Sequence, residues 1–164
     1  MAIHFEGEVE VRWLIESGDD RKMQLLSEFA FVDSSNFTWK ASQGDIIDGA
    51  SIPEIVWSSV VGTPFIGDYR RASVVHDVAC QKKIKTSKEA HRMFYEAMLA
   101  DGTSEMRALM FYTAVRLFGP QWDNATGPSN SEFKAAFASE PTKQRIEFEK
   151  LELALDAVLQ KKNR

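Results

Sequence analysis

Two histidines, His76 and His91, are the side chains in this sequence best suited to chemistry. Between them, Lys82 to Lys85 predicts a turn, and Thr86-Ser-Lys-Glu89 is a capping box that begins a new helix. With a helix on each side and a rise of about 1.5 Å per residue, the two imidazoles are level on antiparallel neighbours. Because imidazole titrates near neutral pH and ligates metals, the pair predicts a proton-transfer site or a metal site. The alternative is that each histidine is a hydrogen-bonded residue of the core.

Two carboxylates, Asp77 and Asp48, complete the candidate site. Adjacent helical residues face different directions, so of His76 and Asp77 one would serve the site while the other anchors it. Asp48, in the loop Gly44–Pro53, either ligates or orients a histidine or makes an Asx-turn. The predicted catalytic residues are His76, Asp77 and Asp48, and the predicted metal ligands are His76, His91, Asp77 and Asp48. Zinc, iron and calcium are the open choices for an ion held by such a set.

Two nucleophiles are secondary candidates. Cys80 stands one turn after His76 on the same helix face, where a thiolate could form, but a small buried residue is the simpler interpretation. Ser51 precedes Pro53 at the start of a predicted short helix, and capping that helix already employs its hydroxyl. Cys80 is also the single cysteine, which excludes an intrachain disulfide and any zinc ribbon that needs paired cysteines.

The elements that must position these residues change in type near residue 50. Before it, alternating and β-branched runs predict strands at Glu8–Ile15, Met23–Val32 and Phe37–Ala41, with a turn at Gly18–Asp20. Beyond it, helical periodicity predicts helices at Ser51–Val60, Tyr69–Gln81, Ser87–Ala100 and Ser104–Phe118. We therefore expect an α+β fold in which an N-terminal antiparallel sheet packs on a helical layer.

Two of these helices carry apolar stripes that predict their buried faces. The first stripe consists of Ala90, Met93, Phe94, Ala97 and Met98. The second consists of Met106, Leu109, Met110, Thr113 and Leu117.

The chain ends in a predicted helix over residues 142–164, which a polar linker at 123–141 separates from a domain at 1–122. Its apolar residues Phe148, Leu151, Leu155 and Val158 follow a three-four-three spacing. This seam predicts contact either with the domain or with another chain, as self-association or as docking onto a partner protein.

Composition bounds the function. With 164 residues, 44% apolar and 27% charged, the chain predicts one globular domain with an appendage. A net charge of −4 argues against general nucleic-acid binding. No stretch reaches about 18 apolar residues, and the N-terminus lacks the pattern of a secretory signal, so we expect no transmembrane segment and a cytoplasmic location.

Four motifs in order resemble a phage- and prophage-borne family, catalogued as domain of unknown function 1353. They are Gly44…Asp48-Gly-Ala-Ser-Ile-Pro53, Tyr69-Arg-x-Ala-Ser-Val-Val-His-Asp77, Glu89-Ala-x-Arg-Met-Phe-x-Glu-Ala-Met98 and Ala114-Val-Arg-x-Phe-Gly119. The resemblance covers roughly Phe29 to Trp122, implies a bacteriophage setting and implies no established activity. Members of the family usually carry aspartate where this chain has His91.

Three functions are open at this point. One is a bacteriophage-encoded component of a virion or tail assembly that docks through its C-terminal helix, found in the host cytoplasm during infection and in the virion. Another is a metal-assisted or His/Asp hydrolase that uses Asp48, His76, Asp77 and His91. The third is an intracellular module that interacts with the host. The His76-Asp77 pair is also similar to that of phospholipase A2, which would make His76 the base and Asp77 a calcium ligand.

Overall fold

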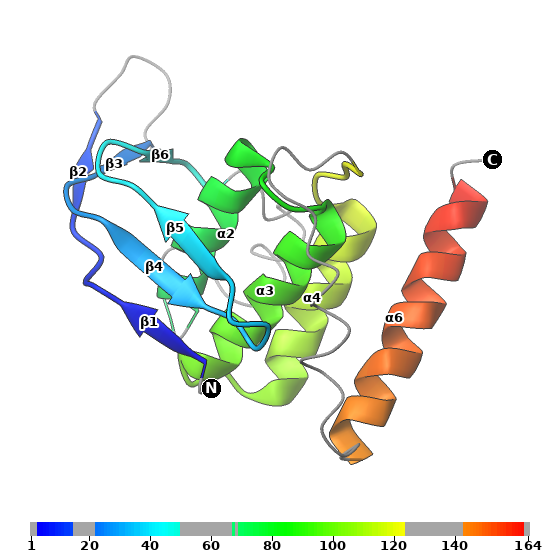
Figure 1. Cartoon of the computed structure of the whole chain (residues 1–164). Helices are drawn as coiled ribbons and strands as arrows, with labels where there is room; N and C mark the ends of the chain where they lie inside the picture. Colours follow the sequence, from blue (N-terminus) through cyan, green and yellow to red (C-terminus); the bar gives the residue numbers. More distant parts are fainter. Residues whose placement is uncertain (1–2, 15–21, 50–66, 68, 124–142, 163–164) are drawn as a thin grey trace. The chain divides into compact units, whose positions relative to one another are not determined.

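The computed structural model describes residues 3–14, 22–49, 67, 69–123 and 143–162. The chain divides into two compact units, residues 1–129 and 130–164. Antiparallel strands come first and helices follow, which confirms the α+β class (Figure 1). The predicted turn at Gly18–Asp20, the predicted helix at Ser51–Val60 and the linker from residue 124 onward lie outside the described residues.

The strands form two three-stranded antiparallel sheets. In one sheet, β4 (Phe29–Val32) lies between β1 (His4–Glu6) and β5 (Thr38–Ala41). In the other, β3 (Met23–Leu25) lies between β2 (Val11–Trp13) and β6 (Ile46–Ile47). The pairing register continues from one sheet to the other without a slip, since Glu6 faces Ala30 and Val11 faces Leu25. The two sheets are therefore halves of one ribbon that is interrupted in its middle.

The interruption corrects the prediction of one continuous strand at Met23–Val32. Between β3 and β4, Leu26 is exposed and the chain bends around Gly7. Gly7 has a φ of 80°, and a Cβ there would meet the carbonyl oxygen of Glu28 at 2.8 Å. A residue without a side chain is needed where two backbones approach this closely. The strands β1 and β6 were not predicted, because each is too short to show a period.

Helix α2 (Arg70–Lys82) is the centre of the helical layer and is buried without a break from Ala72 to Cys80. It packs against α3 (Ser87–Ala100) and against the strands β4, β5 and β6 (Figure 1). A helix that is covered on all sides brings its polar residues into the interior, where each needs a hydrogen-bond partner. His76 and Asp77 are two of the buried polar residues of this helix.

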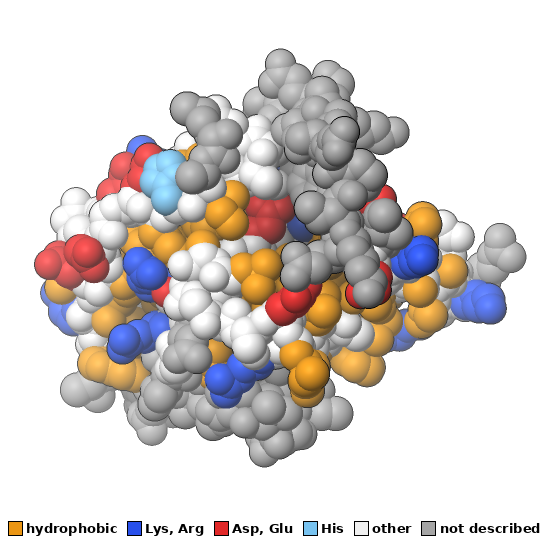
Figure 2. All heavy atoms as spheres, turned by 90° about the horizontal axis from the view of Figure 1, so that it is seen from below, with side chains coloured by type: hydrophobic (Ala, Val, Ile, Leu, Met, Phe, Trp, Pro, Cys, Tyr) orange, Lys and Arg blue, Asp and Glu red, His pale blue; other side chains and the backbone are white. Residues whose placement is uncertain are grey.

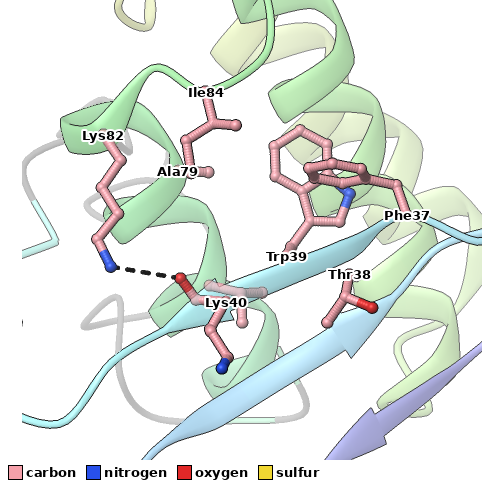
Figure 3. Close-up of a pocket in the computed structure, with 8 residues that line it drawn as sticks. Phe37, Thr38, Trp39, Lys40, Ala79, Lys82 and Ile84 are labelled. Carbon is pink, nitrogen blue, oxygen red and sulfur yellow. Dashed lines mark hydrogen bonds between the residues drawn. The ribbon is translucent and has the colours of Figure 1, made fainter. Parts of the chain in front are cut away.

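The C-terminal end of α2 is attached to the sheet by Lys82. Its ammonium group donates to the carboxylate of Asp45 at 2.6 Å and reaches the backbone oxygen of Lys40 on β5 at 3.5 Å. Figure 3 shows Lys82 and Ala79 from α2 on one side of a crevice of about 40 Å³, with Lys40 and the ring of Trp39 on the other. The attachment fixes the helix turn that carries Cys80 relative to the loop at 45–49.

The helices α3 and α4 (Glu105–Phe118) meet in an aromatic core. All five residues of the predicted stripe on α3 are buried, which confirms that face. The predicted face of α4 is wrong, because Met106 is 75% exposed and Met110 is 51% exposed. The buried face of α4 consists of Ala108, Phe111, Tyr112, Val115 and Arg116.

The aromatic residues decide the rotation of α4. The Phe111 ring lies 4.8 Å from that of Tyr69, and the Tyr112 ring lies 5.9 Å from that of Tyr95. Aromatic side chains bury more surface than methionines and gain from ring contacts, so they face inward. Methionines at the same spacing are left at the surface.

Helix α6 (Lys143–Lys162) spans nearly all of the predicted range 142–164. Along its seam Phe148 and Leu155 are buried, Leu151 is half-buried and Val158 is 51% exposed. Leu153, outside the seam, is 70% exposed. The contact of this seam with another chain stays a prediction.

The two faces of α4 predict contrasting effects of truncation. Phe111→Ala should lower the free energy of unfolding by about 3 to 5 kcal/mol, because it opens a cavity in the aromatic core. Met110→Ala, one position away on the exposed face, should change it by less than about 0.5 kcal/mol. Urea denaturation of the full chain measures both values, and equal effects would contradict the observed rotation of α4.

Candidate functional site

His76 and His91 meet across the α2–α3 hairpin, as the sequence predicts. Nε2 of His76 lies 2.9 Å from Nδ1 of His91. The turn forms because Lys83 adopts a left-handed conformation, with a φ of 51°, that ends α2. Thr86 and Glu89 then make the capping box that begins α3. The hairpin thus places both imidazoles at one level.

Hydrogen bonds fix the tautomers of the pair. Nε2 of His91 lies 3.0 Å from the carbonyl oxygen of Pro120, which can only accept, so this nitrogen carries the proton. Nδ1 of neutral His91 is then an acceptor, and Nε2 of His76 donates to it. Nδ1 of His76 is left without a proton, and it has no hydrogen-bond partner among the described residues. This proton assignment holds for neutral imidazoles, the form that a lowered pKa favours at both residues.

Burial keeps them neutral. The exposed fraction of both His76 and His91 is 0%, and the ring of Phe94 stacks on His76 at 4.4 Å. Burial lowers the pKa of His76 well below its ordinary value, and the neighbouring His91 lowers it further. Burial also lowers the pKa of His91, to about 4; the hydrogen bond to Pro120 opposes this shift and the charge of Arg116 adds to it. Neutral imidazoles retain the lone pairs that proton transfer and metal binding both need.

Cys80 is the third member of the cluster. Its Sγ lies 3.6 Å from Nε2 of His76, one helical turn earlier on α2. The ligand atoms of His76, Cys80 and His91 all lie within 4.8 Å of one another. Cys80 was not among the predicted metal ligands, although its spacing of one helical turn from His76 is a signal visible in the sequence. A proton on Nε2 of His76 also means that this nitrogen cannot take the proton of the Cys80 thiol.

Asp77 holds the preceding loop and is not a member of the three-residue cluster. Its Oδ2 accepts from the backbone nitrogens of Asp48 and Gly49, at 2.9 Å and 3.2 Å. The side chain of Gln81 bridges the same oxygen and the backbone carbonyl of Ile46. Gly49 has a φ of 70°, a left-handed conformation that glycine adopts without strain. Of the neighbours His76 and Asp77, the first belongs to the cluster and the second anchors the loop. A calcium-ligating role for Asp77 stays a prediction.

An open hollow adjoins the cluster. It has a volume of about 440 Å³, and its lining includes the half-buried Asp48 together with Asp77, Cys80, Gln81, Lys83 and Pro120. This volume lies within the range of small-molecule sites, about 300 to 1,000 Å³. Cys80 is the member of the cluster that lines it, while the two histidines lie behind. Asp48 therefore lines the same hollow as Cys80, although it is not one of the three residues of the cluster. Ser51 lies outside the described residues.

The surface carries charges of both signs. Figure 2 shows lysine and arginine side chains interspersed with aspartate, glutamate and apolar side chains on one face. The described part of this face has no extended field of a single sign. Among the helices that the structure describes, none is both long enough and apolar enough to cross a bilayer.

The fold and the cluster define an α+β domain with a buried His-Cys-His group beside an open hollow. Residues 23–115 match the family model described as "Protein of unknown function (DUF1353)", and the chain belongs to this family. The match contains all three residues of the cluster but ends before Pro120. No solved structure matches the chain.

Two curated relatives come from Sinorhizobium fredii. The uncharacterized protein y4jT is 42% identical over 99 residues, which are 60% of this chain and 29% of that protein. The uncharacterized protein y4iH is 39% identical over 105 residues, which are 64% of this chain and 44% of that protein. The chain thus spans less than half the length of either relative.

The lowered pKa values predict loss of stability in acid. A histidine with a lower pKa in the folded state is protonated more readily when the chain is unfolded. Its contribution to the free energy of unfolding is therefore fully present above about pH 6.5. As the pH falls from about 6.5 toward 4, the free energy of unfolding should fall by up to about 1.4 kcal/mol per pH unit for each histidine. Chemical denaturation in the presence of a chelator, at a series of pH values, measures this slope.

Two variants isolate the part of the slope that belongs to the pair. His91→Gln should reduce it, whereas His4→Gln, which replaces a histidine whose side chain is 52% exposed, should leave it unchanged. A slope that His91→Gln does not alter would show that other groups govern the acid response.

Proposed function

We propose that this domain is a hydrolase whose reaction centre is the cluster of His76, Cys80 and His91 at the hollow. The observation that carries the proposal is that one open hollow is lined by both Cys80 and Asp48. Directly behind Cys80 lie two neutral imidazoles in contact with each other. Hydrolysis needs a group that activates water and a group that takes its proton, and this arrangement supplies both kinds.

The roles follow from position. Asp48 lies on the wall of the hollow, where its carboxylate can accept a proton from a water molecule. Asp77 holds the backbone of Asp48 and so acts as a positioning residue. A thiolate mechanism at Cys80 is disfavoured, because the hydrogen bond from His76 to His91 occupies the nitrogen that would act as base. In this proposal the nitrogen and sulfur lone pairs of the cluster serve to bind a group that activates the water or the substrate.

The biological setting is part of the proposal. The four motifs resemble a phage- and prophage-borne family, and on that basis we place the protein in a bacteriophage or prophage, acting in the host cytoplasm. The matched relatives carry no description of activity, so the chemical class of the substrate is left to experiment.

A panel of chromogenic substrates tests the hydrolase. The full chain is assayed against nitrophenyl carboxylic esters, phosphate mono- and diesters, and peptide nitroanilides. Asp48→Asn should lower kcat for the accepted substrate by about 100-fold or more, the usual contribution of a general base. The change keeps the backbone nitrogen that Asp77 holds, so the fold should survive.

Glu28→Gln is the matched control, because it removes the charge of an exposed carboxylate outside the hollow. It should leave kcat unchanged. Equal rates for the natural chain and Asp48→Asn on every substrate of the panel would contradict the hydrolase.

The second candidate is the assembly component, and the exposed apolar residues of α6 favour it. Val158 belongs to the predicted seam and is 51% exposed, and Leu153 is 70% exposed. Large apolar side chains at the surface of a helix are typical of protein interfaces. In this proposal α6 docks onto a copy of the chain or onto another phage protein of a tail or virion through the exposed end of the predicted seam, at Val158.

Sedimentation of the full chain tests the docking helix. The natural chain should sediment as a species larger than a monomer, and Val158→Glu should shift it to the monomer by placing a charge in the seam. Ala157→Glu introduces the same residue one position away, outside the seam, and should not shift it. A natural chain that is monomeric alone and in an infected-cell extract would contradict this candidate.

A further inference from the structure

We infer that His76, Cys80 and His91 together bind one transition-metal ion of the zinc class. Among the atoms that approach one another, Nε2 of His76 lies near both Sγ of Cys80 and Nδ1 of His91. Two nitrogens and a sulfur are the donors that zinc prefers, whereas calcium and magnesium take oxygen. This assignment replaces the carboxylates of the sequence-based ligand set with a cysteine.

The spacing of the three atoms is close to that of a tetrahedral site. Zinc–nitrogen bonds of about 2.0 Å and a zinc–sulfur bond of about 2.3 Å place neighbouring ligand atoms roughly 3.3 to 3.6 Å apart. The two imidazole nitrogens are 2.9 Å apart, and Sγ of Cys80 is 3.6 Å from Nε2 of His76. One ligand atom from each of the three residues lies within 4.8 Å of the other two. Shifts of the side-chain atoms by a few tenths of an ångström to about 1 Å are enough to bring the three ligand atoms to tetrahedral spacing.

The outer contact of His91 has the form that metal-ligating histidines need. Its Nε2–H donates to the carbonyl oxygen of Pro120, which leaves the lone pair of Nδ1 directed at Nε2 of His76. A ligating histidine almost always donates its other N–H to a carbonyl or carboxylate in this way. The proton between the two imidazoles marks the place where the ion would enter.

The proton balance of binding is simple. The Cys80 thiol loses its proton to solvent and becomes the thiolate ligand, while the proton on Nε2 of His76 moves to the free Nδ1 of the same ring. Binding of one dication therefore releases one proton and leaves a net charge of +1 on the site. Three protein ligands leave a fourth position, and Cys80 lies on the side of the hollow.

The use of the ion in catalysis rests on the hydrolase proposed above, but its binding does not. A zinc ion with an open position lowers the pKa of bound water toward 7 and polarises a bond that is to be hydrolysed. Asp48, on the wall of the same hollow, would be placed to take the proton of that water.

Titration with Zn²⁺ alone tests the inference. The full chain, free of any affinity tag and stripped with a chelator, is titrated in competition with a chromophoric zinc indicator. One equivalent should bind, and both Cys80→Ser and His91→Ala should weaken the affinity by at least about 100-fold. His4→Ala is the control, because it removes the third histidine of the chain from an exposed site and should change nothing. Zinc affinity that is the same in Cys80→Ser as in the natural chain would overturn the inference.

Cobalt substitution tests the same site in the natural chain, so the result does not depend on whether a variant folds. With Co²⁺ in place of zinc, the natural chain should show a thiolate-to-cobalt charge-transfer band and the intense visible bands of tetrahedral cobalt. A weak octahedral spectrum without the charge-transfer band would show that Cys80 and the histidines do not form the site.

The outcomes for the ion and for the hydrolase are separable. Zinc binding without hydrolysis of any substrate would support the ion and contradict the hydrolase. Hydrolysis that is unchanged after chelation, in a chain that binds no zinc, would support the hydrolase and overturn the ion.

Discussion

The burial of α2 on all sides is the constraint on which the rest of the structure depends. A helix in this position must find a hydrogen-bond partner for each polar side chain that it carries inward. The Ser73 hydroxyl donates to the backbone oxygen of Tyr69. Asp77 accepts from the backbone nitrogen of Asp48, and His76 donates to His91. These contacts connect α2 to the sheet side and to α3, so the polar residues of one helix hold three parts of the fold together.

The same constraint divides the site into two parts. The imidazoles lie in the interior, where burial favours their neutral form and a neighbouring carbonyl fixes their protons. Asp48 lines the hollow, which is open to solvent. Cys80 is the point of contact between the two parts, because it touches His76 and also lines the hollow. Chemistry at this site would therefore pass through the position of Cys80.

The family match covers the part of the structure that holds the cluster. The matched residues 23–115 include the central part of the sheet, α2, α3 and most of α4. They also include all three members of the cluster. The relatives from Sinorhizobium fredii are longer proteins in which the matched segment is less than half of the chain. Helix α6 lies outside the match.

The sequence by itself determined the hairpin and therefore the meeting of His76 with His91, because a capping box and a helical period are local signals whose spacing fixes the level of two residues. It also determined the α+β order and the inward face of α3. Only the tertiary structure decided the rotation of α4, since Met110 and Phe111 are both apolar and the difference arises from the rings that surround them. It likewise decided that Asp77 turns to the loop and that Cys80 completes the cluster. Such choices depend on atoms from distant segments, at Gly49 and Pro120, that no local pattern along α2 reveals.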